Sequence, residues 1–219
     1  MKILPFGVAV IEGDTHVSKW VLDQKRLDIS RPYLTLLRKY LTPSTVAIDV
    51  GAMIGDHTIV YADWCKSVHA FEPNKEAFEC LIHNMNRFSN VTVHNTALSD
   101  KAHSAEFSIN ENAGASFISE SVAGDVECNT LDSFRIEDIG FIKIDAEGYE
   151  TKILYGSIET IERDSPVMLI EVNSFALERA GSSRAELLSL ISDLGYASSI
   201  TDRRIREEDP QYDIFCLKK

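Results

Sequence analysis

Four acidic residues come at the carboxyl ends of apolar segments, where a parallel sheet would gather them. Asp49, Glu72, Asp145 and Glu171 each lie in or directly after a run of apolar residues typical of a buried strand. If these strands are parallel neighbours, the four carboxylates converge on one crevice at the edge of the sheet. We therefore expect the chemistry of this chain at that edge.

A glycine turn follows the first of these strands and narrows the choice of ligand. The motif Asp49-x-Gly51-x-x-x-Gly55 cannot be aligned with the three glycines of a dinucleotide fingerprint, and no Lys-Ser or Lys-Thr pair follows it as in a phosphate-binding loop. An acidic turn without an anion cradle favours a cationic or neutral ligand. Glu72 lies 21 residues after Gly51, where an acid commonly accepts hydrogen bonds from ribose hydroxyls; the alternative is a charge that stabilises a helix N-terminus.

Composition excludes several classes of partner. The chain has 219 residues and a formal net charge of −12, which disfavours nucleic acid and anionic membrane surfaces. The four cysteines form no C-x-x-C pair, so we expect reduced thiols. No signal peptide and no run of 18 apolar residues is recognisable, and a cytoplasmic protein is therefore expected.

Alternating strands and helices are expected to position the acids. We expect one domain over residues 1–219, with an N-terminal arm and helix in 1–42 and a Rossmann-like core in 43–219. Asp14 and His16 alternate as on a strand, and the pattern after Pro32 indicates a helix up to Leu41. The region 104–128 reads as an inserted β-hairpin. Seven core strands are expected at 46–50, 67–71, 90–95, 141–145, 166–173, 196–200 and 213–217.

Several motifs together resemble one enzyme family. Taken in order, they resemble the FkbM family of S-adenosylmethionine-dependent methyltransferases over about Asp14 to Tyr196. The resemblance implies the class I methyltransferase fold, an α/β structure with helices on both faces of a mostly parallel sheet in the order 3-2-1-4-5-7-6, whose last strand is antiparallel. The motifs are Asp49–Thr58, Ala70–Asn74, Asn129–Ser133, Ile142–Glu150 and Pro166–Asn173.

The resemblance also implies which residues contact S-adenosylmethionine. Asp49 would lie at the sulfonium end, Glu72 would hold the ribose, and Ala97 would lie near the adenine. The turn beneath the methionine portion would be formed by Gly51, Ala52 and Gly55. An acidic turn suits this cofactor because it carries a positive sulfonium and no phosphate.

Methyl transfer to oxygen needs a group that accepts the proton of the attacking hydroxyl. Asp145 is the first candidate, with Glu171 and Glu147 behind it. His57 follows the glycine turn and ranks second to the acids. Lys143 either tunes a neighbouring acid or is a strand residue that extends outward.

Three residues at these strand ends could instead bind a metal ion. Asp145, Glu171 and Asn173 offer three oxygen ligands at adjacent strand ends, as Mg²⁺ would require. A metal-free acidic pocket is the favoured reading.

The expected function is O-methylation of a small molecule or a glycan. The alternatives are an NAD-dependent oxidoreductase, disfavoured by the glycine pattern, and a non-catalytic binding module on the same fold. The acceptor is expected to be selected by the arm around His16 and Trp20 and by the loop 110–116, because such loops carry specificity.

Overall fold

The computed structural model describes residues 1–27, 34, 37–108, 117–120, 124–202 and 204–219. Its centre is a seven-stranded sheet in the order β12-β13-β11-β10-β3-β4-β5. All neighbouring pairs are parallel except those of β13, which runs antiparallel to both β11 and β12. This is the expected fold and strand order, and the fold prediction is confirmed. The strands are β3 (Val46–Val50), β4 (Ser67–Phe71), β5 (Val91–His94), β10 (Ile139–Ile144), β11 (Val167–Asn173), β12 (Tyr196–Ile200) and β13 (Gln211–Lys218).

Side chains of the central strands alternate between two apolar layers. On β3, Ile48 packs in one hydrophobic cluster and Ala47 in the other, since successive strand residues point to opposite faces. Helices α3 and α4 cover the face of Ala47, and α5, α6 and α8 cover the face of Ile48. The helices are α1 (Val17–Gln24), α3 (Thr58–Trp64), α4 (Lys75–Met85), α5 (Glu150–Tyr155), α6 (Ile158–Asp164), α7 (Ser174–Arg179) and α8 (Arg184–Asp193), with a 3₁₀ turn η2 at Leu131–Phe134.

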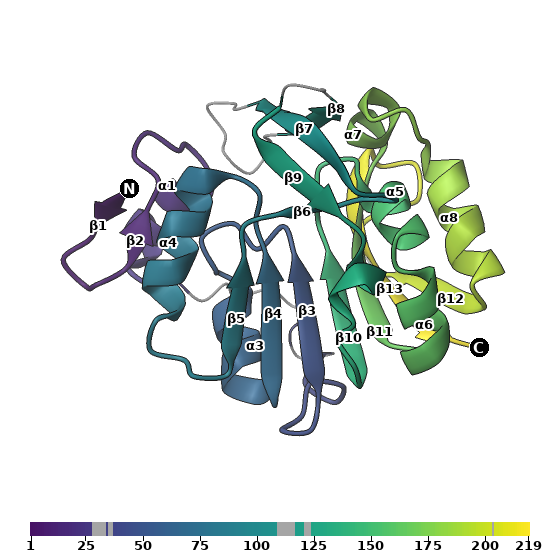
Figure 1. Cartoon of the computed structure of the whole chain (residues 1–219), viewed down its shortest axis with the longest axis horizontal. Coiled ribbons are helices and arrows are strands. Elements are labelled where there is room, and N and C mark those ends of the chain that lie inside the picture. The colour runs from purple at the N-terminus through teal and green to yellow at the C-terminus, as the bar shows by residue number, and fades with distance from the viewer. Residues whose placement is uncertain (28–33, 35–36, 109–116, 121–123, 203) are drawn as a thin grey trace.

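A second sheet stands beyond the carboxyl ends of β3, β4 and β5, at the top of Figure 1. Its four strands have the order β6-β9-β7-β8, so β7 and β8 form a hairpin whose other edge is extended by two further strands. The loop 110–116, expected to select the acceptor, lies outside the described residues. The strands are β6 (Ala97–Leu98), β7 (His103–Ser108), β8 (Phe117–Glu120) and β9 (Val126–Asn129).

The N-terminal segment differs in part from its expected form. Strands β1 (Lys2–Ile3) and β2 (Ala9–Val10) pair antiparallel, as expected for an N-terminal hairpin. The strand proposed for Asp14 and His16 is wrong: Asp14 accepts hydrogen bonds from the main-chain nitrogens of His16 and Ser18 and so fixes the start of α1. Most of the helix expected after Pro32 lies outside the described residues.

The side chain of Asn84 on α4 joins this N-terminal hairpin to the glycine turn. Its amide oxygen accepts from the nitrogen of Ala9, while its amide nitrogen donates to the oxygens of Ala9 and Ile54. All three bonds are buried, and Asn84 itself is only 8% exposed. The first strands of the chain and the loop after β3 are therefore tied through one side chain.

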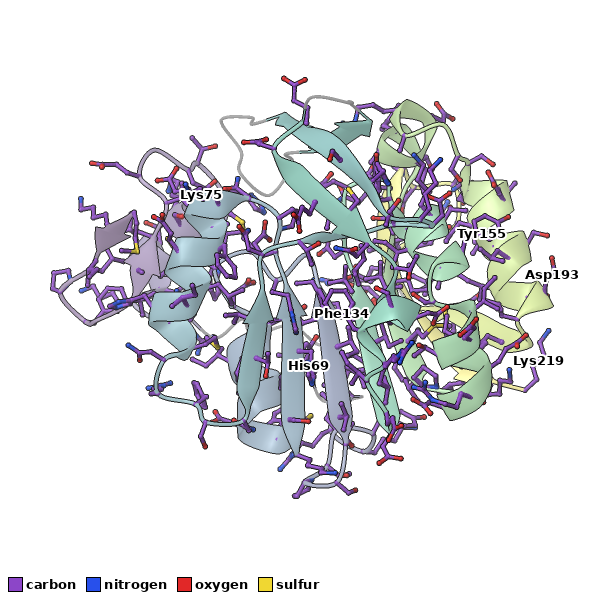
Figure 2. The ribbon with its side chains drawn as sticks, in the orientation of Figure 1. His69, Lys75, Phe134, Tyr155, Asp193 and Lys219 are labelled. Atoms are coloured by element: carbon purple, nitrogen blue, oxygen red, sulfur yellow. The ribbon has the colours of Figure 1, made fainter. Side chains whose placement is uncertain are left out.

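An aromatic side chain from η2 packs against the carboxyl ends of β4 and β5. Figure 2 shows Phe134 and His69 over the parallel strands. The rings of Phe71 and His94 stack with centroids 4.4 Å apart, and Phe134 meets the ring of Phe71 edge-on at 5.0 Å. These contacts position η2 beside the strands that carry the site.

Among the described residues, no helix combines the length and the apolar character that crossing a membrane requires.

Candidate functional site

The turn after β3 is shaped by a close approach between two main-chain segments. The nitrogens of Gly51 and Ala52 both donate to the oxygen of Phe71, which holds the turn against the end of β4. Gly51 has φ +75°, and a Cβ at this position would lie 1.8 Å from the main-chain oxygen of Asp145. Only glycine fits there. Gly55 has φ +94°, and a Cβ there would lie 2.9 Å from the Met85 side chain and 3.0 Å from that of Leu81.

Glu72 is buried beside this turn and organises it. Its two carboxylate oxygens accept hydrogen bonds from the nitrogens of Met53 and Asn74, each at 2.8 Å. Met53 has a positive φ of 51°, a conformation that this bond helps to hold. Burial raises the pKa of Glu72 to about 7, although both main-chain bonds act to lower it.

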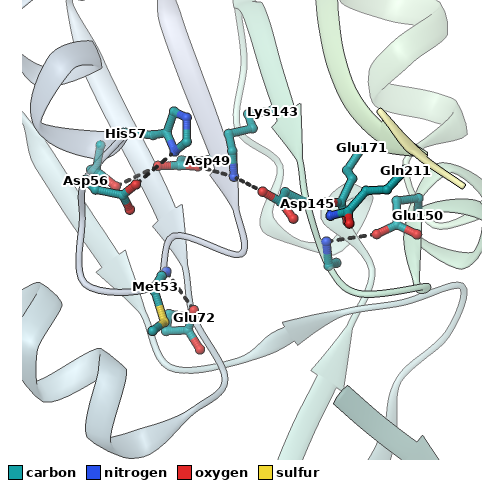
Figure 3. Close-up of polar contacts among 12 residues, drawn as sticks. Asp49, Met53, Asp56, His57, Glu72, Lys143, Asp145, Glu150, Glu171 and Gln211 are labelled. Atoms are coloured by element: carbon teal, nitrogen blue, oxygen red, sulfur yellow. Dashed lines mark hydrogen bonds and ion pairs between the residues drawn. The ribbon is translucent and has the colours of Figure 1, made fainter. Parts of the chain in front are cut away.

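A buried lysine links the acids of β3 and β10 (Figure 3). Lys143 Nζ lies 3.6 Å from Asp49 Oδ1 and 3.3 Å from Asp145 Oδ2. Asp49 is fully buried, and its other oxygen accepts from the Thr58 hydroxyl at 2.6 Å. Burial raises the pKa of Asp49, while the charge of Lys143 opposes that shift. Of the two readings of Lys143, the one in which it tunes neighbouring acids fits this geometry.

A second group of carboxylates lies at the carboxyl ends of β10 and β11. Asp145, Glu147 and Glu171 each place an oxygen within 4.8 Å of the others. The Asp145 side chain is one-third exposed, whereas Glu171 is buried. Burial, followed by the charge of Asp145, raises the pKa of Glu147 to about 8 and that of Glu171 well above its usual range.

Two neighbours complete this group. Gln211 on β13 donates to Glu171 Oε1 at 2.6 Å, and Glu171 Oε2 has no hydrogen-bond partner among the residues that the structure describes. Glu150 is fully buried at the start of α5, where one oxygen accepts from the nitrogens of Ala146 and Gly148. These two hydrogen bonds fix the loop that carries Glu147, whose φ is +52°.

Sequence reasoning gave no role to Thr58, Glu150 or Gln211. Glu150 stands in the same motif as Asp145 and Glu147, and its place directly before an apolar helix was a usable signal. Gln211 reaches Glu171 only through the pairing of β11 with β13, 40 residues along the chain. No local pattern indicates such a contact.

Three of the candidate residues make other contacts. His57 is buried, with Nδ1 3.5 Å from Asp56 Oδ2 at the start of α3. Ala97 is buried in β6, where it pairs with Cys128 of β9. Asn173 Oδ1 accepts from the nitrogen of Ala176 and caps α7, so its side-chain oxygen is already engaged at the helix rather than offered with those of Asp145 and Glu171.

Comparison with known proteins identifies related sequences and folds. The family model described as a methyltransferase FkbM domain matches residues 49–198, more than half of the chain. No curated protein sequence matches this chain significantly.

Solved structures share the fold at low sequence identity. The FkbM methyltransferase of Methylobacillus flagellatus is 20% identical, with a TM-score of 0.57, over 86% of this chain and 48% of that one. This chain therefore spans about half the length of that protein. A candidate methyltransferase of Streptococcus mutans, crystallised with SAH, is 15% identical, with a TM-score of 0.57, over 87% and 99% of the two chains. The precorrin-6y C5,15-methyltransferase of Geobacter metallireducens is 16% identical, with a TM-score of 0.53, over 89% and 92%.

Proposed function

The chain belongs to the FkbM methyltransferase family, and from that premise we propose that it methylates a hydroxyl group of a small molecule or a glycan. The cofactor of this family is S-adenosylmethionine, which supplies a methyl group activated by a positive sulfonium.

The glycine turn is the observation that carries the proposal, because its residues fit this cofactor. Gly51 lets the turn lie against the main chain of Asp145, which any Cβ would prevent, and so fixes the turn that would hold the cofactor. Asp49 supplies a buried negative charge next to that turn, as a sulfonium needs. Glu72 supplies a carboxylate whose remaining lone pairs can accept from ribose hydroxyls. We assign Ala52, Gly55 and Ala97 to the same pocket by their family positions.

We assign the reacting centre to the acids of β10 and β11. Asp145 is one-third exposed whereas Glu171 is buried, and the Oδ2 of Asp145 is held by Lys143. It is therefore positioned to accept the proton of an acceptor hydroxyl, and Lys143 acts as its positioning residue. Glu171 and Glu147 border the same space, and His57 is assigned a supporting place beside the turn.

We place the acceptor-selecting surface in two segments around the crevice. The four-stranded sheet stands beyond the carboxyl ends of the parallel strands, where ligands of such folds bind. The N-terminal segment contributes His16, which is exposed, and Trp20, which is half-buried. Polar and aromatic groups of this kind suit hydroxyl-rich acceptors.

Calorimetric titration with S-adenosylhomocysteine and with NAD tests the cofactor. We expect micromolar binding of S-adenosylhomocysteine, about −8 kcal/mol, and none of NAD. Binding of NAD alone would establish an oxidoreductase, and binding of neither would favour a non-catalytic module.

Transfer of a labelled methyl group to a panel of hydroxylated small molecules, oligosaccharides and amines tests the acceptor. Asp145→Asn should lower the rate by at least 100-fold without weakening S-adenosylhomocysteine binding. Labelling of amines alone would refute O-methylation.

A further inference from the structure

The carboxylates at the ends of β10 and β11 have the geometry of a cation site. We propose that Asp145, Glu147 and Glu171 bind one hard divalent cation, of the class of Mg²⁺, Mn²⁺ or Ca²⁺. The first observation is their convergence: one oxygen from each lies within 4.8 Å of the other two. The members come from three different places, the end of β10, the following loop and β11, so the sheet itself brings them together.

The spacing matches the size of such ions. Two oxygens on one ion are separated by at most twice the bond length, about 4.2 Å for Mg²⁺ and about 4.6–5.2 Å for Ca²⁺. Three oxygens inside 4.8 Å can therefore bind one ion with little or no movement. A set made only of carboxylates selects hard cations over zinc or copper.

The second observation is an unsatisfied oxygen on a buried member of the cluster. Glu171 is only 8% exposed, its Oε1 accepts from Gln211, and its Oε2 accepts no hydrogen bond from the described part of the chain. Figure 3 shows the carboxyl group of Glu171 beside that of Asp145. A buried carboxylate oxygen without a partner costs free energy, which a bound cation would recover.

The surrounding groups are compatible with a cation. Lys143 contacts Oδ2 of Asp145, which leaves Oδ1 for an ion. Gln211 orients Glu171 from outside the cluster, and Glu150 holds the loop of Glu147 through the nitrogens of Ala146 and Gly148. Such supporting hydrogen bonds orient the ligands of metal sites.

This site differs from the one considered on sequence grounds. Asn173 caps α7, and Glu147 takes its place. The role of the ion rests on the proposed function: an ion at this position would bind the acceptor oxygen and lower the pKa of its hydroxyl, whose proton would pass to water. With Oδ1 on the ion and Oδ2 on Lys143, Asp145 would then serve as a ligand and not as the proton acceptor.

Binding of Mn²⁺ to the purified full chain, without any other ligand, tests the site. The Mn²⁺ that remains free is counted by its electron paramagnetic resonance signal, and Ca²⁺ and Mg²⁺ are added as competitors. We expect one Mn²⁺ per chain, displaced by both competitors, and a loss of affinity of at least tenfold in Glu171→Gln. The matched control is Glu162→Gln, which removes an exposed carboxylate on α6 and should leave binding unchanged.

Glu147→Gln provides a second variant if the buried substitution prevents folding, because Glu147 is only partly buried. Absence of bound Mn²⁺ at millimolar concentration would overturn the proposal. Unchanged affinity in both variants would overturn it equally. Binding of S-adenosylhomocysteine, measured separately, distinguishes this failure from failure of the proposed function. If the role of the ion is correct, treatment with EDTA raises the KM for the acceptor and leaves S-adenosylhomocysteine affinity unchanged.

Discussion

Of the two glycines in the turn, Gly51 has the closer main-chain neighbour. Gly51→Ala would force a Cβ to within 1.8 Å of the Asp145 oxygen in a backbone conformation that L-residues disfavour. We expect loss of S-adenosylhomocysteine binding in calorimetry and destabilisation by about 2–4 kcal/mol in chemical denaturation. Gly181→Ala is the matched control, since Gly181 has a similar φ of +82° and open space around it. Equal losses in both variants would show that backbone strain alone, without the contact to Asp145, explains the effect.

Lys143 compensates two acids, one of them fully buried. Lys143→Met should lower the free energy of unfolding by about 3 kcal/mol at neutral pH, because Asp49 would be left buried without its cation. Urea denaturation measures this loss. Asp49→Asn in the same chain should restore part of the stability, and a double variant no more stable than Lys143→Met would contradict the pairing.

Glu72 gives the site a pH dependence. Its pKa is raised from about 4.5 to about 7, so the folded protein keeps the proton over a range in which the unfolded chain has lost it. The contribution of Glu72 to stability is therefore greatest below pH 4.5 and is lost as the pH rises through 7. Ribose hydroxyls donate to the ionised form, so affinity for S-adenosylhomocysteine should increase several-fold from pH 6 to pH 8. Calorimetry at both values checks this, and Glu72→Gln should bind weakly with no such dependence.

Among the elements, the 3₁₀ turn η2 is joined to α6 by the side chain of Asp132. Its two carboxylate oxygens accept from the nitrogens of Glu159 and Thr160, so it caps a helix from 27 residues away. Asp132→Ala should lower the free energy of unfolding by about 1 kcal/mol, as the loss of other helix caps does. Differential scanning calorimetry measures the change. Asp125→Ala, at an exposed position before β9, should have little effect, and an equal loss there would argue against capping.

Elements with a strong local pattern were predictable from the sequence. The strand β3 is a continuous apolar run around one acid. Asn74 and Ser183, residue types that favour helix starts, accept hydrogen bonds from main-chain nitrogens in the first turns of α4 and α8. The segment after Gly13 was misread because alternation of Asp14 and His16 resembles a strand. In the structure the Asp14 side chain bonds to the main chain ahead of it and starts α1.

Contacts that depend on tertiary structure were not predictable in the same way. The parallel pairing of β6 with β9 turns the expected hairpin into a four-stranded sheet, and both of these strands are short. The oxygen of Asp145 that excludes a Cβ at Gly51 belongs to another strand end, so the sequence shows the glycine but not its reason. The acids were found because strand ends are visible in the sequence, whereas their partners Thr58 and Gln211 are set by packing.

At the scale of the whole molecule, the turn, the lysine and the acid cluster form one polar system at the carboxyl ends of the strands. Glu72 bonds to the turn at Met53, Asp49 and Asp145 share Lys143, and Asp145 continues into the cluster with Glu171. The chain as a whole has a formal net charge of −12. A cation bound at either end of this system therefore lowers a repulsion that the protein carries throughout.

Because Asn84 bonds to both Ala9 and Ile54, hydrogen exchange in the first strands of the chain is expected to respond to a ligand at the glycine turn. The amide hydrogen of Ala9 is bound by a side chain whose other end holds the oxygen of Ile54, next to Gly55. When the turn is fixed by a ligand, opening of this junction requires more free energy. Hydrogen–deuterium exchange at Ala9 should therefore slow on addition of S-adenosylhomocysteine, although the strand that carries Ala9 is not among the elements assigned to the cofactor. The exchange rate at the beginning of the sequence would then measure the occupancy of the site.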